Sequence, residues 1–330
     1  MSDVQRRMVS LEVCAGAGGM ALGLEQAGFD PFALVDNRDK ACLTLRANRP
    51  KWQVLERDLL RLDPRSDLPD HDEIDLLAAG LPRVRSAATA SRARGDGWEL
   101  ELLETTGRWV WELRPRAVLL ENVPDLIRRS ENAQSRSLVE KHLDDAGYEF
   151  TWKVLNASNF GIPQHRELGV LVAFRDGGLD RFEAAVNAVA TPSNMSVGAV
   201  LRTSMAARGW LQADQWAAYA DRIAPTVVGG SWDRGGADLG PSGSQRAWAG
   251  LGVQGKSLAD RPPAMDFDWD PADPERHVRL TVDQVAQLQG FPASWEICGR
   301  KTARYRQIGS ATPPAVARGL GSAIRMGLIG

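Results

Sequence analysis

The sequence contains little cysteine and little histidine. Its three cysteines, Cys14, Cys42 and Cys298, are odd in number and far apart, which excludes a framework of disulfides. The four histidines are scattered, and neither a CxxC nor an HxxxH pattern occurs. Because zinc sites commonly take their ligands at such spacings, we expect no bound metal, zinc in particular.

Long hydrophobic runs and a strong net charge are also missing. The longest apolar segments have the length of a strand, and the opening MSDVQRRMVS lacks the apolar core of a signal peptide. We therefore expect a cytoplasmic protein with no membrane partner. The net charge is only −2, so no overall basic field indicates nucleic acid, although a local basic face is compatible with this total.

Short apolar segments alternate with amphipathic ones in the first half of the 330 residues. Strands are expected at Met8–Cys14, Phe32–Val35, Val54–Leu55, Ile74–Ala79, Ala117–Leu120, Glu149–Leu155 and Gly169–Phe174. Helices are expected at Met20–Gln26, Lys40–Ala47, Trp98–Leu113 and Ser137–Asp145. This alternation predicts an α/β fold with a doubly wound, mostly parallel sheet.

The alternation fades from about Arg175 to Val278, where Gly, Pro, Trp and Arg are frequent and helix signals are few. We expect a smaller, irregular domain there. A helix over Val282–Leu288 follows, with Thr281 as its N-cap and Gln284 completing a capping box. A final helix is expected to start at Pro313-Pro314, because proline suits the first turn.

The first strand runs into a glycine-rich turn, CAGAGG, at residues 14–19. Such glycines let the backbone approach a ligand, and the following helix N-terminus favours anionic groups. Asp36 ends the second strand, where an acid can bind ribose hydroxyls. Asp58 follows the third strand and suits an adenine amino group. An adenosine ligand explains all three features, whereas the alternative is ordinary turn glycines and helix caps. A nucleoside triphosphate is disfavoured because the phosphate-loop pattern with Lys-Ser/Thr is absent.

Taken in order, the motifs of nearly the whole chain resemble those of the DNA cytosine-5 methyltransferases of restriction-modification type. LEVCAGAGG, ALVDN and ERDLL look like the cofactor motifs of that family. AVLLENV looks like its Glu-Asn-Val motif, and NASNFGIPQHREL like its Gln-x-Arg-x-Arg motif. RLTVDQVAQLQGFP and QIGSATPP look like its two closing motifs.

The resemblance implies a Rossmann-like methyltransferase domain at residues 1–175, a target-recognition domain at 176–278, and a segment, 279–330, that returns to the first domain. It also implies that the last helix packs beside the first. The cofactor would be S-adenosylmethionine or its product S-adenosylhomocysteine, and the partner double-stranded DNA. The implied cofactor residues are Cys14, Ala15, Gly16, Gly18, Gly19, Asp36, Asn37, Asp58, Leu59, Pro82 and Ser310.

Catalytic positions follow from the same resemblance: Glu121, Gln164, Arg166 and Arg83. In the family, a Pro-Cys pair follows the fourth strand, and its cysteine adds to C6 of a flipped-out cytosine. Here the pair is Pro82-Arg83. A thiolate can attack at neutral pH, whereas a guanidinium stays protonated and has no lone pair to give.

Other residues depart from the family in the same direction. Leu168 replaces the second arginine of the Gln-x-Arg-x-Arg motif, and Ser310 replaces an asparagine near the cofactor. Glu121 is retained, but a neighbouring Arg83 would pair with it and lower its pKa, which would make it a poor proton donor. A purely structural role for Glu121 is the alternative.

Two glycine- and arginine-rich segments are expected to contact DNA phosphates. The expected contact residues are Arg85, Arg92, Arg94, Gly229, Gly230 and Arg234. The alternative for the arginines of residues 85–94 is a solvated surface loop. Tryptophans interleave with arginines in the recognition region, a pattern that suits nucleic acid, but in a region with few aliphatic runs they are more often core. These tryptophans are Trp210, Trp216, Trp232, Trp248 and Trp269.

The leading hypothesis is a member of the family that binds DNA and cofactor but has lost methyl transfer, working beside a methyltransferase, nuclease or defence subunit. A second hypothesis is an active DNA (cytosine-5-)-methyltransferase, alone or with a partner supplying the nucleophile. A third is different chemistry in the former cytosine pocket, with Arg83 binding an anionic substrate. The large insert disfavours an RNA methyltransferase.

Overall fold

The computed structural model describes residues 7–69, 73–83, 97–191, 195–229 and 236–329. The chain divides into two compact units. The first unit consists of Met1–Leu155, Glu167–Ala190 and Val316–Gly330. The second unit consists of Asn156–Arg166 and Thr191–Ala315.

The first unit is built on a seven-stranded sheet with the order β3-β2-β1-β4-β5-β8-β6. Its strands are β1 (Met8–Val13), β2 (Phe29–Asp36), β3 (Val54–Glu56), β4 (Leu76–Gly80), β5 (Ala117–Asn122), β6 (Glu149–Asn156) and β8 (Glu167–Phe174). β1 to β5 pair in parallel, and β8 runs antiparallel to β5. The α/β class and the doubly wound, mostly parallel sheet expected from the sequence are confirmed.

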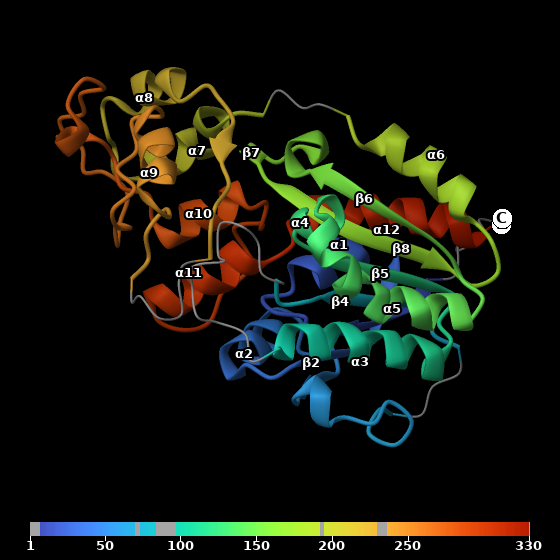
Figure 1. The fold of residues 1–330 in the computed structure, drawn as a ribbon. Coiled ribbons are helices and arrows are strands. Elements are labelled where there is room, and N and C mark those ends of the chain that lie inside the picture. The colour runs from blue at the N-terminus through green and yellow to red at the C-terminus, as the bar shows by residue number, and fades with distance from the viewer. Residues whose placement is uncertain (1–6, 70–72, 84–96, 192–194, 230–235, 330) are drawn as a thin grey trace, which may run out of the picture. The chain divides into compact units, whose positions relative to one another are not determined.

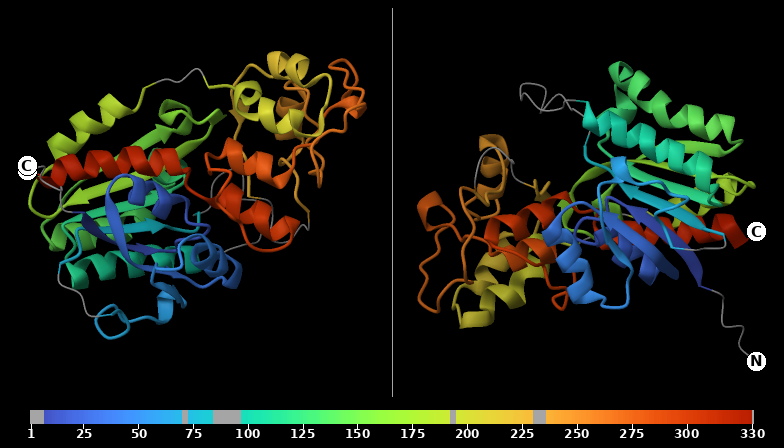
Figure 2. Two further views of the ribbon diagram at one scale, coloured as in Figure 1. Left: turned by 180° about the vertical axis from the view of Figure 1, so that it is seen from behind. Right: turned by 90° about the horizontal axis from the view of Figure 1, so that it is seen from below.

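Helices cover both faces of this sheet (Figure 1). They are α1 (Gly19–Gln26), α2 (Asp39–Asn48), α3 (Trp98–Leu113), α4 (Asp125–Arg128), α5 (Ala133–Asp145), α6 (Leu179–Val189) and α12 (Pro314–Ile329). One apolar core joins α3 and α5 to the sheet, with Trp109 and Val110 among its fully buried members. Figure 2 shows α12 on the face of the sheet opposite α3 and α5.

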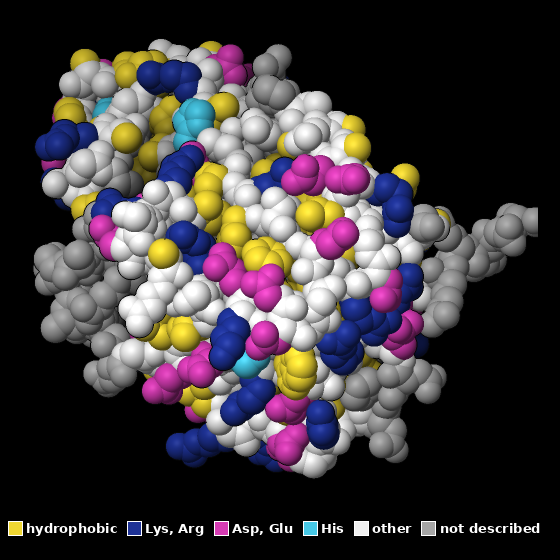
Figure 3. All heavy atoms as spheres, turned by 45° about the vertical axis from the view of Figure 1, so that its right-hand side comes forward, with side chains coloured by type: hydrophobic (Ala, Val, Ile, Leu, Met, Phe, Trp, Pro, Cys, Tyr) yellow, Lys and Arg dark blue, Asp and Glu magenta, His cyan; other side chains and the backbone are white. Residues whose placement is uncertain are grey.

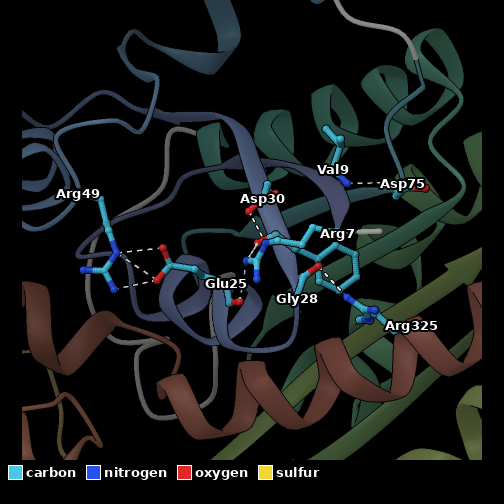
Figure 4. A network of polar contacts seen from close by, with 9 residues as sticks. Arg7, Val9, Glu25, Gly28, Asp30, Arg49, Asp75 and Arg325 are labelled. Carbon is cyan, nitrogen blue, oxygen red and sulfur yellow. Dashed lines mark hydrogen bonds and ion pairs between the residues drawn. The ribbon is translucent and has the colours of Figure 1, made fainter. Parts of the chain in front are cut away.

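The last helix does pack beside the first. A Cβ added at Gly321 of α12 would lie 2.8 Å from the Cβ of Ala27 and 3.0 Å from Cδ2 of Leu24, so the two backbones approach closely. Polar contacts fix the neighbouring turns (Figure 4). Arg325 donates to the Gly28 carbonyl at 2.7 Å, and Arg49 pairs with Glu25 at 2.8 Å. The first strand and the last helix therefore belong to one folding unit although they lie at opposite ends of the chain.

The second unit is more helical than the sequence indicated. It contains α7 (Val197–Met205), α8 (Ala213–Tyr219), α9 (Ser242–Ala249), α10 (Val282–Leu288) and α11 (Lys301–Ser310), with β7 (Gln164–His165) parallel to β9 (Ala224–Pro225). The expectation of an irregular domain was wrong for α7 to α9. Four tryptophans of this region are buried, as a core role requires: Trp210, Trp216, Trp248 and Trp269. Trp232 lies outside the described residues.

The unit boundaries also differ from the expected domain boundaries at residues 175 and 278. α6 belongs to the first unit, and the residues from Val282 to Ala315 belong to the second. The capping box at the start of α10 is present, with Thr281 and Gln284 bonding each other's backbone. α12 begins at Pro314, where a helix was expected to start.

Candidate functional site

The glycine turn follows β1, the strand at which the chain switches from building one half of the sheet (β1, β2, β3) to building the other (β4, β5). β1 stands between β2 and β4, and ligands of such sheets bind outside the carboxyl ends of the strands at this point. The turn requires positive φ at Gly16 (55°) and Gly18 (80°). Cys14 also adopts φ 55°, a conformation that is uncommon for residues other than glycine.

Asp36 holds this turn. Its Oδ2 accepts a hydrogen bond from the Gly16 amide at 2.8 Å, and its Oδ1 accepts one from the Arg38 amide at 2.9 Å. A carboxylate has about four acceptor positions, so Asp36 keeps capacity for ligand hydroxyls. The next residue, Asn37, is exposed.

Asp58 follows β3 and caps a short 3₁₀ helix, Leu59–Arg61, by accepting from the Leu60 amide at 3.1 Å. Leu59 is buried and Asp58 is half-buried. The parallel sheet thus brings the ends of β1, β2 and β3, with Cys14, Asp36 and Asp58, to one edge. These residues are the ones that the sequence assigned to an adenosine ligand.

Glu12 is the penultimate residue of β1 and lies next to the glycine turn. The sequence did not indicate it as a site residue. It is 1% exposed, and among the described residues neither of its carboxylate oxygens has a hydrogen-bond partner. Burial, and then the charge of Asp36, raise the pKa of Glu12 well above its usual range. An acid inside MVSLEV, a strand that is apolar except for Ser10 and Glu12, was the signal that could have revealed it.

Arg83 lies just past the end of β4. In the ladder between β4 and β5, Gly80 pairs with Glu121. Just beyond it, the side-chain Nδ2 of Asn122 donates to the Pro82 carbonyl at 3.2 Å. Glu121 is buried, being 5% exposed. The expected ion pair between Arg83 and Glu121 is absent from the described residues: Arg83 is exposed and makes no hydrogen bond or ion pair with any of them. A guanidinium in water avoids the desolvation that pairing with a buried carboxylate would require.

The two thiols beside the glycine turn are poor nucleophiles. Burial, and then the charge of Asp36, raise the pKa of the Cys14 thiol to about 12. Burial also raises the pKa of Cys42 to about 12, and its Sγ donates to the Asp36 carbonyl at 3.4 Å. Both residues are therefore thiols, not thiolates, near neutral pH.

Gln164 and Arg166 lie in the second unit, in a buried network of backbone contacts. Arg166 Nη1 donates to the carbonyls of Val227 and Gly309, each at 3.0 Å. The Gln164 amide accepts from the Val227 amide at 2.8 Å and donates to the Gln289 side chain at 2.9 Å. These contacts hold the segment at Val227 in place. Gln289 is a further network member that sequence analysis missed.

Ser310 ends α11, and its hydroxyl donates to the Arg306 carbonyl at 2.6 Å. Gly229 packs closely on the same helix, because a Cβ on Gly309 would lie 2.4 Å from the Gly229 Cα. Close packing therefore accounts for glycine at position 309, whereas a Cβ on Gly229 would lie 3.2 Å from the Ser310 amide nitrogen. The other expected DNA contacts, Arg85, Arg92, Arg94, Gly230 and Arg234, lie outside the described residues.

Charge and metal-binding groups are dispersed. Figure 3 shows basic and acidic side chains interspersed over the face that it draws. Within the described residues, no group of three or more His, Cys, Asp or Glu side chains is placed to hold a metal ion. No helix there is long and apolar enough to cross a membrane.

Residues 8–326 match the family described as C-5 cytosine-specific DNA methylase. The chain is 41% identical over 327 residues to the Type II methyltransferase M.NaeI of Lentzea aerocolonigenes, covering 96% of this chain and 75% of that protein. It is 36% identical over 326 residues to the Type II methyltransferase M.NgoMIV of Neisseria gonorrhoeae, covering 96% and 97%. The chain belongs to the C-5 cytosine-specific DNA methylase family.

Solved structures share the fold. The S. pombe Dnmt2 methyltransferase matches with a TM-score of 0.66 at 19% identity, covering 98% of this chain and 100% of that one. The Entamoeba histolytica methyltransferase EhMeth matches with a TM-score of 0.63 at 10% identity, covering 97% and 98%.

Proposed function

We propose that this member of the family binds DNA together with S-adenosylmethionine or S-adenosylhomocysteine and does not itself transfer a methyl group. The observation that carries the proposal is Arg83, which follows the end of β4 where the resemblance places the attacking cysteine. A nucleophile must donate a lone pair to C6 of the cytosine, and a guanidinium has none. Cys14, the thiol in the glycine turn, is held protonated by burial and by Asp36.

One feature of the first unit supports cofactor binding independently of the sequence motifs. Glu12 is a buried carboxyl without a partner among the described residues, beside the glycine turn. Such a group is costly unless a donor or cation reaches it, and the ammonium of the cofactor's amino acid part is both. When bound, S-adenosylmethionine supplies a sulfonium methyl group.

The remaining parts of the cofactor have residues of matching chemistry. Asp36 would accept from the ribose hydroxyls and Asp58 from the adenine amino group. Leu59, which is buried at the end of the same sheet edge, would pack against the adenine ring. Asp36 also fixes the Gly16 amide, so ligand binding and turn geometry depend on one carboxylate.

DNA is the proposed macromolecular partner because the family is described as a DNA methylase. Relatives that match 96% of this chain are named Type II methyltransferases. A chain that binds DNA without modifying it would work beside another methyltransferase, a nuclease or a defence subunit, in the cytoplasm. Such a role depends on site chemistry, since fold alone does not determine function.

A second function is favoured by one observation. Arg83 is exposed and has no carboxylate within 4.0 Å among the described residues, so its charge is available to an anionic substrate. An upward shift in melting temperature with carboxylated or phosphorylated small molecules, abolished in Arg83→Ala, would support different chemistry at this position.

The proposal is tested by measuring binding and transfer on the same sample. The purified chain is titrated with duplex DNA of mixed sequence and then incubated with tritiated S-adenosylmethionine. We expect salt-dependent binding without incorporation of tritium. Incorporation that scales with the amount of chain would establish the active methyltransferase instead. Incorporation that needs a second protein would establish a partner nucleophile.

A further inference from the structure

The second unit contains a hollow of about 430 Å³ that the proposed function leaves unassigned. One wall is formed by β7 and β9, in which His165 pairs with Pro225. α9 and the turn after it supply the opposite wall. A hollow of this size lies within the usual range for small-molecule and nucleotide sites.

The floor of the hollow is aliphatic. Ile223, Pro225, Ala247 and Leu251 line it. Thr226 also lines it, but its hydroxyl is occupied, because it donates to the His165 carbonyl at 2.5 Å. Apart from the exposed His165, which also lines the hollow, the floor presents carbon rather than free donors, and it suits a flat or sugar-like group instead of a small hydrophilic ion.

The rim carries a positioned cation, Arg222. Its guanidinium lies 5.7 Å from the centroid of the Tyr219 ring, and one of its terminal nitrogens donates to the Gly250 carbonyl. Among the described residues, no carboxylate lies within 4.0 Å of Arg222, so its charge is uncompensated there. An arginine held by a ring and a carbonyl loses little further freedom when it binds an anion, and its geometry matches a phosphate.

A nucleotide combines the two properties, a phosphate and an apolar ring or sugar beside it. We propose that the hollow is a nucleotide-contact site, in which Arg222 binds a DNA phosphate and the aliphatic floor takes the sugar or base next to it. The inference rests on the proposed DNA binding and adds the residues that anchor the DNA to the second unit. A partner protein that inserts an apolar side chain is the competing occupant.

The test measures affinity for a fluorescent duplex by anisotropy over a series of salt concentrations. Each phosphate contact contributes about 0.9 to the slope of log K against log salt. We expect Arg222→Ala to lower this slope by about 0.9 and to weaken binding about tenfold at 0.1 M salt. Arg222→Lys keeps the charge and should keep the slope. Ala247→Glu, which places an anion on the floor at an exposed helix position, should weaken binding as Arg222→Ala does.

Arg202→Ala is the matched control. Arg202 is an exposed arginine of the same unit that pairs with Asp214 at 2.6 Å and does not line the hollow. We expect less than about a twofold effect, as for most exposed ion pairs. Affinity for S-adenosylhomocysteine should stay constant in all variants, which separates loss of the contact from misfolding.

The outcomes separate the inference from the function it rests on. If the unmodified chain binds no DNA, the proposed function fails and the inference fails with it. If the chain binds DNA but Arg222→Ala and Ala247→Glu keep its affinity and salt slope, the inference alone is overturned. Loss confined to some sequences at an unchanged slope would also overturn it, because that pattern marks a base-edge contact.

Discussion

At the scale of single residues, the candidate site combines groups that suit cofactor binding with a group that opposes catalysis. The places of Asp36 and Asp58 were predictable from the sequence, because Asp36 ends the largely apolar strand β2 and Asp58 follows β3. Glu12 was not, since its importance comes from burial without a partner. The ion pair expected between Arg83 and Glu121 is not formed among the described residues. Knowing that two strands end side by side does not tell in which direction a long side chain points.

Restoring the missing thiol tests how much else has changed. We expect Arg83→Cys to leave methyl transfer at least about a hundredfold below that of an active relative, because residues that act as one unit do not contribute additively. Leu168, buried in β8, stays in place of the family's second arginine. Initial rates with tritiated cofactor give the answer, and transfer near that of the relative would show that Arg83 alone blocks the reaction.

Glu12 predicts a pH-dependent stability. Its folded pKa is raised, so below the unfolded pKa of about 4.3 the group is neutral in both states and makes no pH-dependent contribution to stability. As pH rises towards the folded pKa, the unfolded chain releases its proton first, and stability falls. Glu12→Gln should remove this loss and gain on the order of 1 kcal/mol at pH 7 relative to pH 5.

Urea unfolding at both pH values, without cofactor, measures the effect. The exposed Glu56, which pairs with Arg46 at 3.1 Å, provides the control substitution Glu56→Gln. An unchanged pH dependence in Glu12→Gln would mean that Glu12 is ionised in the folded protein.

At the scale of helices and strands, periodicity predicted the elements whose apolar face is long. α3 and α10 begin and end where the sequence placed them. α7, α8 and α9 were missed because they are short and lie in a region where Gly, Pro and Trp are frequent. α9 is formed by SGSQRAWA, where burial of Trp248 by tertiary packing, not helix propensity, decides the structure.

Replacing glycine by alanine should have opposite effects in two helices, because Gly321 of α12 packs against α1 whereas Gly243 of α9 meets open space. Gly321→Ala should destabilise the chain by about 1–3 kcal/mol, because the added carbon overlaps Ala27. Gly243→Ala in α9 meets open space and should stabilise it by about 0.5–1 kcal/mol. Denaturant midpoints measure both, and equal effects of the two substitutions would contradict the close packing of α12.

At the scale of the whole molecule, the order of motifs predicted the family and the return of the last helix to the first. The extent of the second unit was harder to predict, because Asn156–Arg166 and Val282–Ala315 join it through contacts between distant segments. The Gln164–Gln289 hydrogen bond is one such contact. No local pattern indicates that two glutamines far apart in sequence will meet.

The charge of Arg83 predicts the ligand preference of the whole cofactor site. A cation near the sulfonium disfavours S-adenosylmethionine, whereas its thioether product is not opposed. We expect the two ligands to bind within about tenfold of each other, with Arg83→Ala shifting the ratio towards S-adenosylmethionine. Calorimetry with both ligands measures it; a strong preference of the unmodified chain for the sulfonium would refute the repulsion.

Covalent trapping tests the central claim most directly. Duplex DNA that carries 5-fluorocytosine is incubated with the chain and S-adenosylmethionine, then separated on a denaturing gel beside an active relative. The relative's thiolate should form a stable adduct, and this chain should form none because Arg83, at the position of the family's cysteine, has no lone pair to give to C6. An adduct with this chain, mapped to any of its residues, would contradict the account.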